Sequence, residues 1–233
     1  PEDVVMPLVP MFHVNAWCMP YSAPMAGAAL VLPGPHVADA SAMTDLINCE
    51  QVTFSLGVPT LWNGINQYLN TSGTRIPSLS RGVIGGAAGA LQLYHDMDQH
   101  GVRLENGWGM TELSPIGSYN RYLPGHDQLE EAVRDDQRLK SGRPLFGIQM
   151  RIVDEDGNSL PHDGETTGVL EIRGPWACST YYGKPQEHDW FNTGDVATID
   201  PSGYMRITDR VKDVIKSGGE WISSIEIENV IMS

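Results

Sequence analysis

The first 125 or so residues alternate short apolar runs with segments of helical spacing, and this alternation restricts the fold more than any other feature of the chain. The run VTFSLGVPT (52–60) predicts a strand and a turn, and PTLWNGINQYL (59–69) predicts a helix that begins at Pro59. RGVIGGAAGA (81–90) predicts a strand that ends in a glycine-rich turn, and LQLYHDMDQHG (91–101) predicts the next helix. Such alternation indicates a layered α/β domain.

Three further segments complete this region. GAALVLPG (27–34) predicts a buried strand, ADASAMTDLINCEQ (38–51) predicts a capped helix, and GVRLENGWG (101–109) predicts a second strand that runs into glycine. Ligands of open α/β sheets bind where the ends of strands meet. Because two of the predicted strands end in small-residue turns, we expect a ligand site at those turns.

The character of the chain changes after the charge-rich segment 127–140, which predicts a surface helix. The runs IQMRIVDEDGNSLP, TGVLEIRG and TGDVATIDPSGYMRITD alternate apolar and polar residues and are joined by Asp-Gly or Pro-Ser-Gly turns. They predict a small antiparallel β subdomain. The last stretch, 210–233, combines a lysine-rich strand, a Gly-Gly loop and the start of a helix.

Composition excludes several classes of function. The formal net charge of −14 argues against a nucleic-acid partner and against adhesion to an anionic membrane. No stretch approaches the roughly 20 apolar residues of a membrane span. Cys18, Cys49 and Cys178 form neither a disulfide framework nor a zinc pattern, which favours a reducing cytoplasm. The chain begins with Pro1 and ends inside a predicted helix, so we expect it to be a fragment of a longer protein.

The motif GWGMTE, at residues 107–112, combines groups suited to a nucleotide. The two glycines allow the backbone to approach a ligand, Trp108 offers a flat face for stacking, and the Thr111 hydroxyl can donate to a phosphate oxygen. Glu112 then supplies an oxygen ligand for Mg²⁺, a hard cation. The plainer alternative is a turn at the end of a strand with a core tryptophan and a solvated glutamate.

Two more segments carry candidate polar groups. TGDVATID places Asp195 after a Thr-Gly turn at the start of a predicted strand, where a carboxylate can accept from both hydroxyls of a ribose. The alternative is an aspartate that accepts from the turn amides, which is the commoner role. DRVKDVIKSGGEWISS (209–224) interleaves charges before a flexible SGG loop, and its alternative is an ordinary exposed strand and turn.

PMFHVNAW places His13 and Trp17 four residues apart, which puts them on one face if the segment is helical. That face could line an apolar pocket. A buried histidine beside a core tryptophan is the commoner arrangement.

Taken in this order, the motifs resemble those of the adenylate-forming acyl-CoA synthetase superfamily, which also contains firefly luciferase and the adenylation domains of peptide synthetases. The resemblance covers nearly the whole chain, from PMFHVNAW to SGGEWISSIEIEN. FHVNAW, GWGMTELSP and DRVKDVIKSGGEWISS are most similar to medium- and long-chain fatty acyl-CoA synthetases, and similar also to the ligase that acts on 3-methylmercaptopropionate.

The resemblance implies a nucleotide site. Trp108, where most relatives carry Tyr, stacks on adenine, Thr111 bonds the α-phosphate and Glu112 coordinates Mg²⁺. Asp195 holds the ribose with help from Arg210. The implied nucleotide-binding residues are Gly86, Ala87, Ala88, Gly107, Trp108, Gly109, Met110, Thr111, Asp195 and Arg210. Relatives often carry Pro where this chain has Gly89-Ala90, which leaves the shape of that loop open.

The resemblance also implies an acyl gate and a hinge. Trp17 gates the acyl tunnel with His13 beside it. Lys212 is the hinge residue, and the segment after it meets the pantetheine arm of coenzyme A. That segment contributes Lys216, Gly218, Gly219 and Trp221. Thr111, Glu112 and Lys216 are the residues implied to assist the chemistry.

The implied fold is a layered α/β subdomain, a small antiparallel β subdomain and the start of a C-terminal α+β domain. We expect residues 1–145 to form the α/β part of a large AMP-binding domain, and 146–208 its β subdomain. Residues 209–213 are then the hinge, and 214–233 the truncated start of the small domain. The phosphate-binding loop of the family is expected upstream of Pro1, and the lysine that assists adenylation beyond Ser233.

The implied activity is the conversion of a carboxylic acid, ATP and coenzyme A to an acyl-CoA through an acyl-adenylate, with Mg²⁺. We expect a fatty acid as the substrate, with 3-methylmercaptopropionate as the alternative, and little turnover by the fragment alone. A homodimer is consistent with several relatives. Two other functions stay open: a non-catalytic module that binds AMP or an acyl-adenylate, and a luciferase-like oxygenase.

Overall fold

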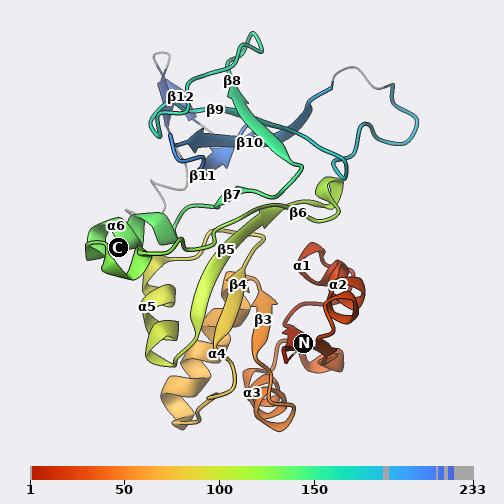
Figure 1. The fold of residues 1–233 in the computed structure, drawn as a ribbon, viewed down its shortest axis with the longest axis vertical. Helices are drawn as coiled ribbons and strands as arrows, with labels where there is room; N and C mark the ends of the chain where they lie inside the picture. Colours follow the sequence, from red (N-terminus) through yellow and green to blue (C-terminus); the bar gives the residue numbers. More distant parts are fainter. Residues whose placement is uncertain (1, 186–188, 214, 218–219, 223–233) are drawn as a thin grey trace. The chain divides into compact units, whose positions relative to one another are not determined.

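The structure is a computed structural model that describes residues 2–185, 189–213, 215–217 and 220–222 (Figure 1). The chain divides into two compact units. The first unit comprises residues 1–116 and 121–139, and the second comprises 117–120 and 140–233. The chain therefore passes between the units three times, after residues 116, 120 and 139.

The first unit is built on five parallel strands in the order β2-β1-β3-β4-β5. They are β1 (Val4–Pro7), β2 (Ala29–Leu30), β3 (Phe54–Gly57), β4 (Arg81–Ile84) and β5 (Arg103–Gly109). The helices of this unit are α1 (Val14–Trp17), α2 (Met19–Met25), α3 (Ala40–Cys49), α4 (Pro59–Ser72), α5 (Leu91–Gln99) and α6 (Glu131–Arg138). The short 3₁₀ turns are η1 (Gly34–His36), η2 (Thr111–Leu113) and η3 (His126–Gln128). This layered α/β arrangement confirms the prediction.

Local sequence explains where the helices begin and end. The Asp39 carboxylate accepts hydrogen bonds from the backbone N–H groups of Ser41 and Ala42, which caps the first turn of α3. Pro59 occupies the first turn of α4, where its missing N–H costs nothing. α4 ends at Gly73, whose φ of +70° is the left-handed conformation that glycine adopts most readily.

The core of the first unit lies between the sheet and the helices. Its largest fully buried side chain is Trp62 of α4, whose indole N–H donates to the carbonyl of Val83 on β4 at 3.1 Å. The remaining core includes Met6, Leu8, Met43, Ile47, Ile65, Leu69, Ile84, Tyr94, Met97 and Leu104. Apolar burial of this extent is the main source of stability in a domain of this size.

One strand prediction was wrong. Residues 27–34 were expected to form a buried strand, but β2 contains only Ala29 and Leu30, and neither is buried. β2 lies at the edge of the parallel sheet and pairs only with β1 among the described strands. Leu32, beyond the strand, is 61% exposed. An apolar run alone does not distinguish a central strand from an edge strand.

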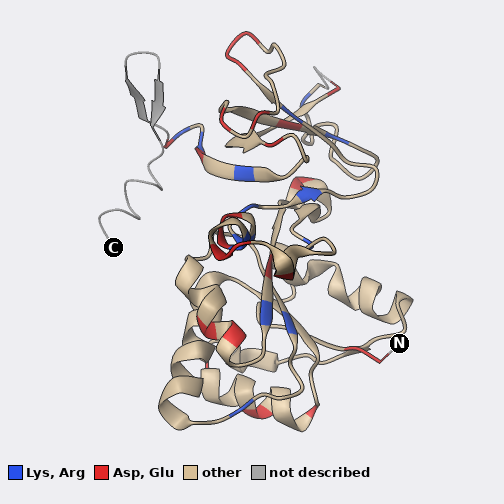
Figure 2. Ribbon diagram, turned by 60° about the vertical axis from the view of Figure 1, so that its left-hand side comes forward, with Lys and Arg blue, Asp and Glu red and all other residues tan. Residues whose placement is uncertain are grey.

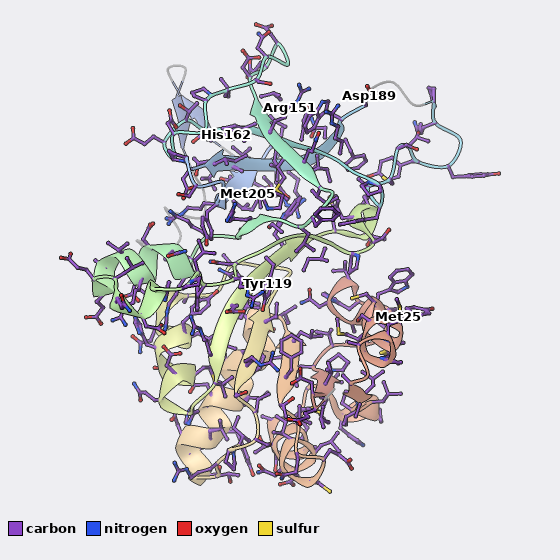
Figure 3. The ribbon with its side chains drawn as sticks, viewed as in Figure 1. Met25, Tyr119, Arg151, His162, Asp189 and Met205 are labelled. Atoms are coloured by element: carbon purple, nitrogen blue, oxygen red, sulfur yellow. The ribbon has the colours of Figure 1, made fainter. Side chains whose placement is uncertain are left out.

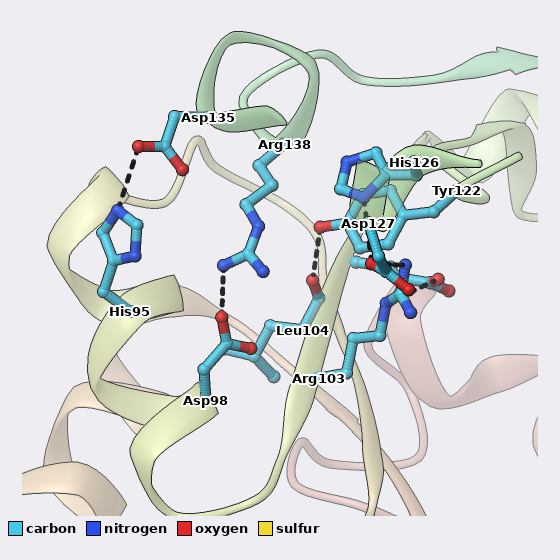
Figure 4. Close-up of polar contacts among 10 residues, drawn as sticks. His95, Asp98, Arg103, Leu104, Tyr122, His126, Asp127, Asp135 and Arg138 are labelled. Carbon is cyan, nitrogen blue, oxygen red and sulfur yellow. Dashed lines mark hydrogen bonds and ion pairs between the residues drawn. The ribbon is translucent and has the colours of Figure 1, made fainter. Parts of the chain in front are cut away.

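A polar cluster attaches residues 121–138 to the strand and helix beneath them (Figure 4). The Tyr122 hydroxyl donates to the carbonyl of Leu104 on β5 at 3.0 Å, and the Arg138 guanidinium pairs with Asp98. The Tyr122 ring stacks on His126, with 4.1 Å between ring centroids, and the Arg103 guanidinium lies 4.1 Å from the centre of the same ring. The cluster orders a segment that has few apolar residues.

The second unit contains a four-stranded antiparallel sheet in the order β11-β10-β9-β8. These strands are β8 (Gln149–Val153), β9 (Gly168–Arg173), β10 (Phe191–Ile199) and β11 (Met205–Arg210). β6 (Ile116–Tyr119) pairs with β7 (Arg143–Pro144), and β12 (Ile215–Ser217) pairs with β13 (Glu220–Ile222). The predicted antiparallel β subdomain is therefore confirmed.

Tight turns set the register of this sheet. Between β10 and β11 the Asp200 carboxylate accepts from the backbone N–H groups of Ser202 and Tyr204. Its pKa is lowered, because these hydrogen bonds and the Lys140 ammonium 3.0 Å away outweigh the effect of burial. The Asp-Gly and Pro-Ser-Gly signals of the sequence thus mark real turns.

Charged side chains are spread over both units, and α6 alternates acidic with basic residues (Figure 2). None of the helices in the described part of the chain has the length and apolar character that a membrane crossing requires.

Candidate nucleotide site

The ends of β4 and β5 lie side by side, as the sequence predicts. The two strands are parallel and paired, with Ile84 opposite Asn106. β4 ends at Ile84 and leads into the turn formed by Gly86, Ala87 and Ala88, all three of which are exposed. β5 does not end before its glycines but continues through them to Gly109.

The first helix of the chain packs against both strand ends. A Cβ atom on Gly85 would lie 2.7 Å from the Asn15 side-chain oxygen and 3.2 Å from the Gly107 carbonyl oxygen, so a side chain there would have to displace the Asn15 amide. Gly86 has a φ of +86°, and a Cβ atom on it would lie 3.7 Å from the His13 ring. Segments that begin near residues 13, 85 and 107 therefore meet at one place.

The motif after Trp108 folds back on itself. A Cβ atom on Gly109 would lie 2.0 Å from the Pro115 carbonyl oxygen, a distance that only glycine permits. The Leu113 N–H donates to Met110 and the Ser114 N–H to Thr111, which closes the 3₁₀ turn, and the Ser114–Pro115 peptide is cis. The turn is anchored by Leu113, which is fully buried.

The candidate ligand-binding side chains of this motif stay at the surface. Thr111 is exposed, and Trp108 and Glu112 are partly buried. The backbone of the motif is thus fixed by close packing, while a ring, a hydroxyl and a carboxylate keep access to a ligand. This is the arrangement that stacking on a base and binding of a phosphate with its metal require.

Beside this turn lies a hollow of about 160 Å³ within the first unit. Its wall combines Trp17 with Thr111, so the residues predicted for the gate and for the phosphate lie in the same cavity. The complete lining is Phe12, Val14, Trp17, Thr111, Ser114 and Pro115. Most of these side chains are apolar, and the two hydroxyl groups lie on one turn.

His13 and Trp17 do not both lie within a helix, which was the condition for a shared helical face. α1 is a single turn, and His13 precedes it in an extended conformation, with its Nδ1 atom accepting from the Asn15 N–H at 3.1 Å. His13 therefore lies near Gly86, whereas Trp17 lines the hollow and is half exposed. Asn15 was missed, because its role depends on the approach of α1 to the strand ends.

The apolar side chains around the hollow continue along α2. Phe12 is 85% exposed, and Tyr21 and Met25 are also exposed. Figure 3 labels Met25, which belongs to α2. The rings of Trp17 and Tyr21 lie 6.1 Å apart.

Asp195 belongs to the second unit, and it lies inside β10 rather than at its start. The strand is irregular between Asn192 and Val196, and Gly194 has a φ of +73°. The Asp195 N–H donates to the Thr193 hydroxyl, which in turn donates to the Leu170 carbonyl. Thr193 was missed as a supporting residue, although it belongs to the TGD motif.

Arg210 lies directly opposite Asp195 on the neighbouring strand β11. Its Nε atom is 2.8 Å from the Asp195 carboxylate, and the side chains are 56% and 4% exposed respectively. The two residues thus form an ion pair, and their predicted joint role toward a ribose stays a prediction. Trp108, Thr111 and Glu112 belong to the other unit, so their joint use with Asp195 for one nucleotide stays a prediction.

The predicted hinge and coenzyme A segments are described only in part. Lys212 is exposed, and its Nζ atom lies 3.9 Å from the Asp213 carboxylate. Lys216 on β12 and Trp221 on β13 are cross-strand partners. Gly218 and Gly219 lie outside the described residues.

Among the described residues no group of three or more His, Cys, Asp or Glu side chains could hold a metal ion by itself.

Comparison with known proteins agrees with these features. Residues 1–182 match the family model described as AMP-binding enzyme. The chain is 50% identical over 236 residues to the 3-methylmercaptopropionyl-CoA ligase of Ruegeria lacuscaerulensis, covering 99% of this chain and 44% of that protein. It is 45% identical over 237 residues to the medium-chain-fatty-acid–CoA ligase of Ectopseudomonas oleovorans, covering 100% of this chain and 43% of that protein.

A solved structure extends the comparison to the fold. The O-succinylbenzoate coenzyme A synthetase of Bacillus subtilis, in complex with ATP and magnesium ion, superposes with a TM-score of 0.81 at 25% identity. The match covers 99% of this chain and 46% of that one. The chain thus spans less than half the length of the relatives it matches. Motifs, fold and comparisons agree, and the chain belongs to the AMP-binding enzyme family.

Proposed function

We propose that the protein containing this chain activates a carboxylic acid with ATP and transfers the acyl group to coenzyme A. The observation that carries the proposal is the meeting of three segments in the first unit: the glycine turn after β4, the Gly107–Gly109 strand end, and α1. Relatives of the chain named as CoA ligases support the same reaction.

The proposed first step joins the acid to the nucleotide. A carboxylate oxygen of the acid attacks the α-phosphorus of ATP, the bond to the β-phosphate oxygen breaks, and pyrophosphate leaves. Trp108 stacks on the adenine, the Gly86–Ala88 turn borders it, and the Thr111 hydroxyl donates to an α-phosphate oxygen. Catalysis of this kind depends mainly on positioning and on stabilising charge.

Glu112 is the residue proposed to hold Mg²⁺, which supplies positive charge against the phosphates when it is bound. Asp195 accepts hydrogen bonds from the ribose hydroxyls in this proposal. The ion pair with Arg210 holds the Asp195 carboxylate in one orientation. The Asp195 side chain is almost fully buried, whereas that of Arg210 reaches solvent.

In the proposed second step the sulfur of coenzyme A attacks the acyl carbon and its thiol proton is released to solvent, while the bond between the acyl carbon and the phosphate oxygen breaks and AMP leaves with the bonding electrons. The hinge at residues 209–213, centred on Lys212, changes the position of the following segment between the two steps. Lys216, Gly218, Gly219 and Trp221 belong to that segment. Lys212 is proposed for its place in the chain rather than for its side chain.

The acid is proposed to be a fatty acid, with 3-methylmercaptopropionate as the second candidate. The mainly apolar lining of the hollow favours an acyl tail, and the volume of about 160 Å³ is near that of a cavity of about 150 Å³ known to hold benzene. The second candidate is favoured by the 50% identity to a ligase named for that acid.

The proposal is tested on the full-length protein with a panel of short, medium and long fatty acids and 3-methylmercaptopropionate. We expect pyrophosphate release with ATP, and AMP and an acyl-CoA once coenzyme A is added. Release of ADP would contradict the adenylation step. Binding of AMP without any pyrophosphate release would favour a non-catalytic module.

We also propose a cytoplasmic location and a homodimer. Cys18, Cys49 and Cys178 are all free, which fits a reducing compartment. Sedimentation of the full-length protein tests the dimer, and fractionation of the source cells tests the location.

A further inference from the structure

A buried tyrosine lies close to two segments of the candidate nucleotide site, namely the glycine-rich turn after β4 and the end of β5. Tyr94 on α5 is fully buried, and its hydroxyl donates to the side-chain oxygen of Asn106 at 2.5 Å. Burial raises the pKa of the Tyr94 hydroxyl, so it stays protonated and available as a donor. A buried hydroxyl on a core helix needs such a partner, and here the partner is on β5.

Asn106 immediately precedes the Gly107–Gly109 strand end that carries Trp108. Its side chain is mostly buried, and the amide nitrogen donates to the Arg138 carbonyl at 2.7 Å. The amide oxygen therefore accepts from α5 while the nitrogen donates to the end of α6. Because both its oxygen and its nitrogen are hydrogen-bonded, the Asn106 amide has one orientation. These two hydrogen bonds of the side chain also fix the position of the β5 backbone at this residue.

Tyr94 also lies close to the glycine-rich turn after β4. A Cβ atom on Gly89, at the end of the glycine-rich turn after β4, would lie 3.1 Å from the Tyr94 hydroxyl oxygen and 3.1 Å from its ring. The same Cβ atom would lie 3.0 Å from the Ile84 side chain, so a side chain at residue 89 would have to move both neighbours slightly. The Tyr94 hydroxyl thus lies close to the segment after β4 and, through Asn106, is bonded to the strand that carries Trp108.

We propose that Tyr94 is a positioning residue for the nucleotide: its hydroxyl, acting through Asn106, sets the distance between the Trp108 ring and the Gly86–Ala88 turn. Tyr94 touches no substrate in this proposal, which rests on the proposed function. An adenine ring can contact the Trp108 ring and the Gly86–Ala88 turn at the same time only if these two groups are separated by the right distance. A shift of either segment should weaken nucleotide binding while leaving the acyl pocket intact.

The test compares Tyr94→Phe with Tyr122→Phe in the full-length protein. Each variant removes one buried hydroxyl that donates to β5, since Tyr122 donates to Leu104 two residues before Asn106. Both should lose a similar amount of thermal stability. Only Tyr94→Phe should raise the KM for ATP and the Kd for AMP, by about three- to tenfold, the range of one hydrogen bond. The KM for the acid should not change.

A second variant keeps the test decisive if Tyr94→Phe fails to fold. Gly89→Ala leaves the hydrogen bond to Asn106 possible but crowds the Tyr94 hydroxyl, and it should raise the KM for ATP in the same direction. An unchanged KM for ATP and Kd for AMP in these variants, or an equal change in Tyr122→Phe, would overturn the positioning role. If the wild-type protein neither binds AMP nor releases pyrophosphate, the proposed function itself fails.

Discussion

In the first unit the residues predicted to contact the nucleotide lie at or just after the ends of parallel strands, whereas in the second unit Asp195 lies inside an antiparallel strand. The first group is held by its backbone. Gly85 and Gly109 each sit where a Cβ atom would meet other atoms of the site, at 2.7 Å and 2.0 Å. Asp195 is held by side-chain interactions, namely its ion pair with Arg210 and the Thr193 hydroxyl behind its N–H.

The difference shows which kind of change should harm each of these two groups of residues. A site shaped by the backbone loses its shape and stability when a glycine gains a side chain. Changes to its exposed side chains leave the fold intact. A site shaped by an ion pair keeps its fold under a conservative change and loses mainly its binding group. Stability and nucleotide binding should therefore respond differently in the two units.

The largest effect is expected for Gly109→Ala. The added methyl group would lie 2.0 Å from the Pro115 carbonyl oxygen, so the turn that carries Thr111 must move. We expect a loss of about 3 kcal/mol in the free energy of unfolding and loss of pyrophosphate release. Gly64→Ala in α4 is the matched control, because a Cβ there meets nothing within 4 Å. It should stabilise the protein by up to about 1 kcal/mol. Equal stability of the two variants would refute the backbone argument.

Glu112→Gln should separate binding from stability in the first unit. The residue is partly exposed on a turn that is anchored by Leu113, so the free energy of unfolding should change by less than about 0.5 kcal/mol. Pyrophosphate release should fall about 100-fold, and more Mg²⁺ should be needed for half-maximal rate. A magnesium titration at saturating ATP measures this. An unchanged titration curve would remove Glu112 from metal binding.

Asp195→Asn tests the second unit. The amide keeps the shape of the side chain but weakens both the contact with Arg210 and the proposed acceptance from the ribose. The KM for ATP should rise about tenfold, the effect of one charge-assisted hydrogen bond. The loss of stability should be about 1 kcal/mol, since the Arg210 side chain that loses its partner is 56% exposed. A loss of stability with an unchanged KM would make Asp195 a structural residue only.

The glycine-rich segments led to the prediction of a ligand site in the first unit, because a run of small residues at the end of a strand is typical of backbone that a ligand approaches closely. The sequence placed residues 81–90 correctly as strand and turn and found the strand in 101–109, although β5 continues through its glycines to Gly109. The parallel pairing of β4 with β5 brings their ends together. What the sequence could not supply was the approach of other elements. Asn15 and Tyr94 matter because α1 and α5 pack against the turns, and no local pattern encodes that contact.

The errors have similar causes. Residues 27–34 are apolar enough for a central strand, but the sheet uses them as a two-residue edge. His13 and Trp17 have helical spacing, but the helix begins only at Val14. Asp195 was expected to begin a strand because of the Thr-Gly before it, whereas Gly194 forms an irregularity within one.

The smallest expected effect is on the pH dependence of the free energy of unfolding. It is tested by comparing His126, a buried histidine of the first unit, with His162, an exposed histidine of the second. The His126 ring is buried, and its Nε2 atom has no hydrogen-bond partner among the described residues. Burial lowers the pKa of His126, and the positive charges of Arg103 and Arg138 lower it further, while Asp127, 3.4 Å from Nδ1, opposes the shift. The folded state therefore favours the neutral ring, and the unfolded state binds the proton more readily.

The sign of the pH effect follows from this difference. The contribution of His126 to stability is fully present above the ordinary histidine pKa and is lost as the pH falls through that value and then through the lower folded pKa. Urea unfolding of the wild-type protein between about pH 5 and 7 should show this loss, and His126→Gln should reduce the slope. His162→Gln, at an exposed position, should leave the slope unchanged. Equal slopes for His126→Gln and the wild type would mean that protonation of this ring does not oppose folding, and that the stack on Tyr122 tolerates a charged imidazole.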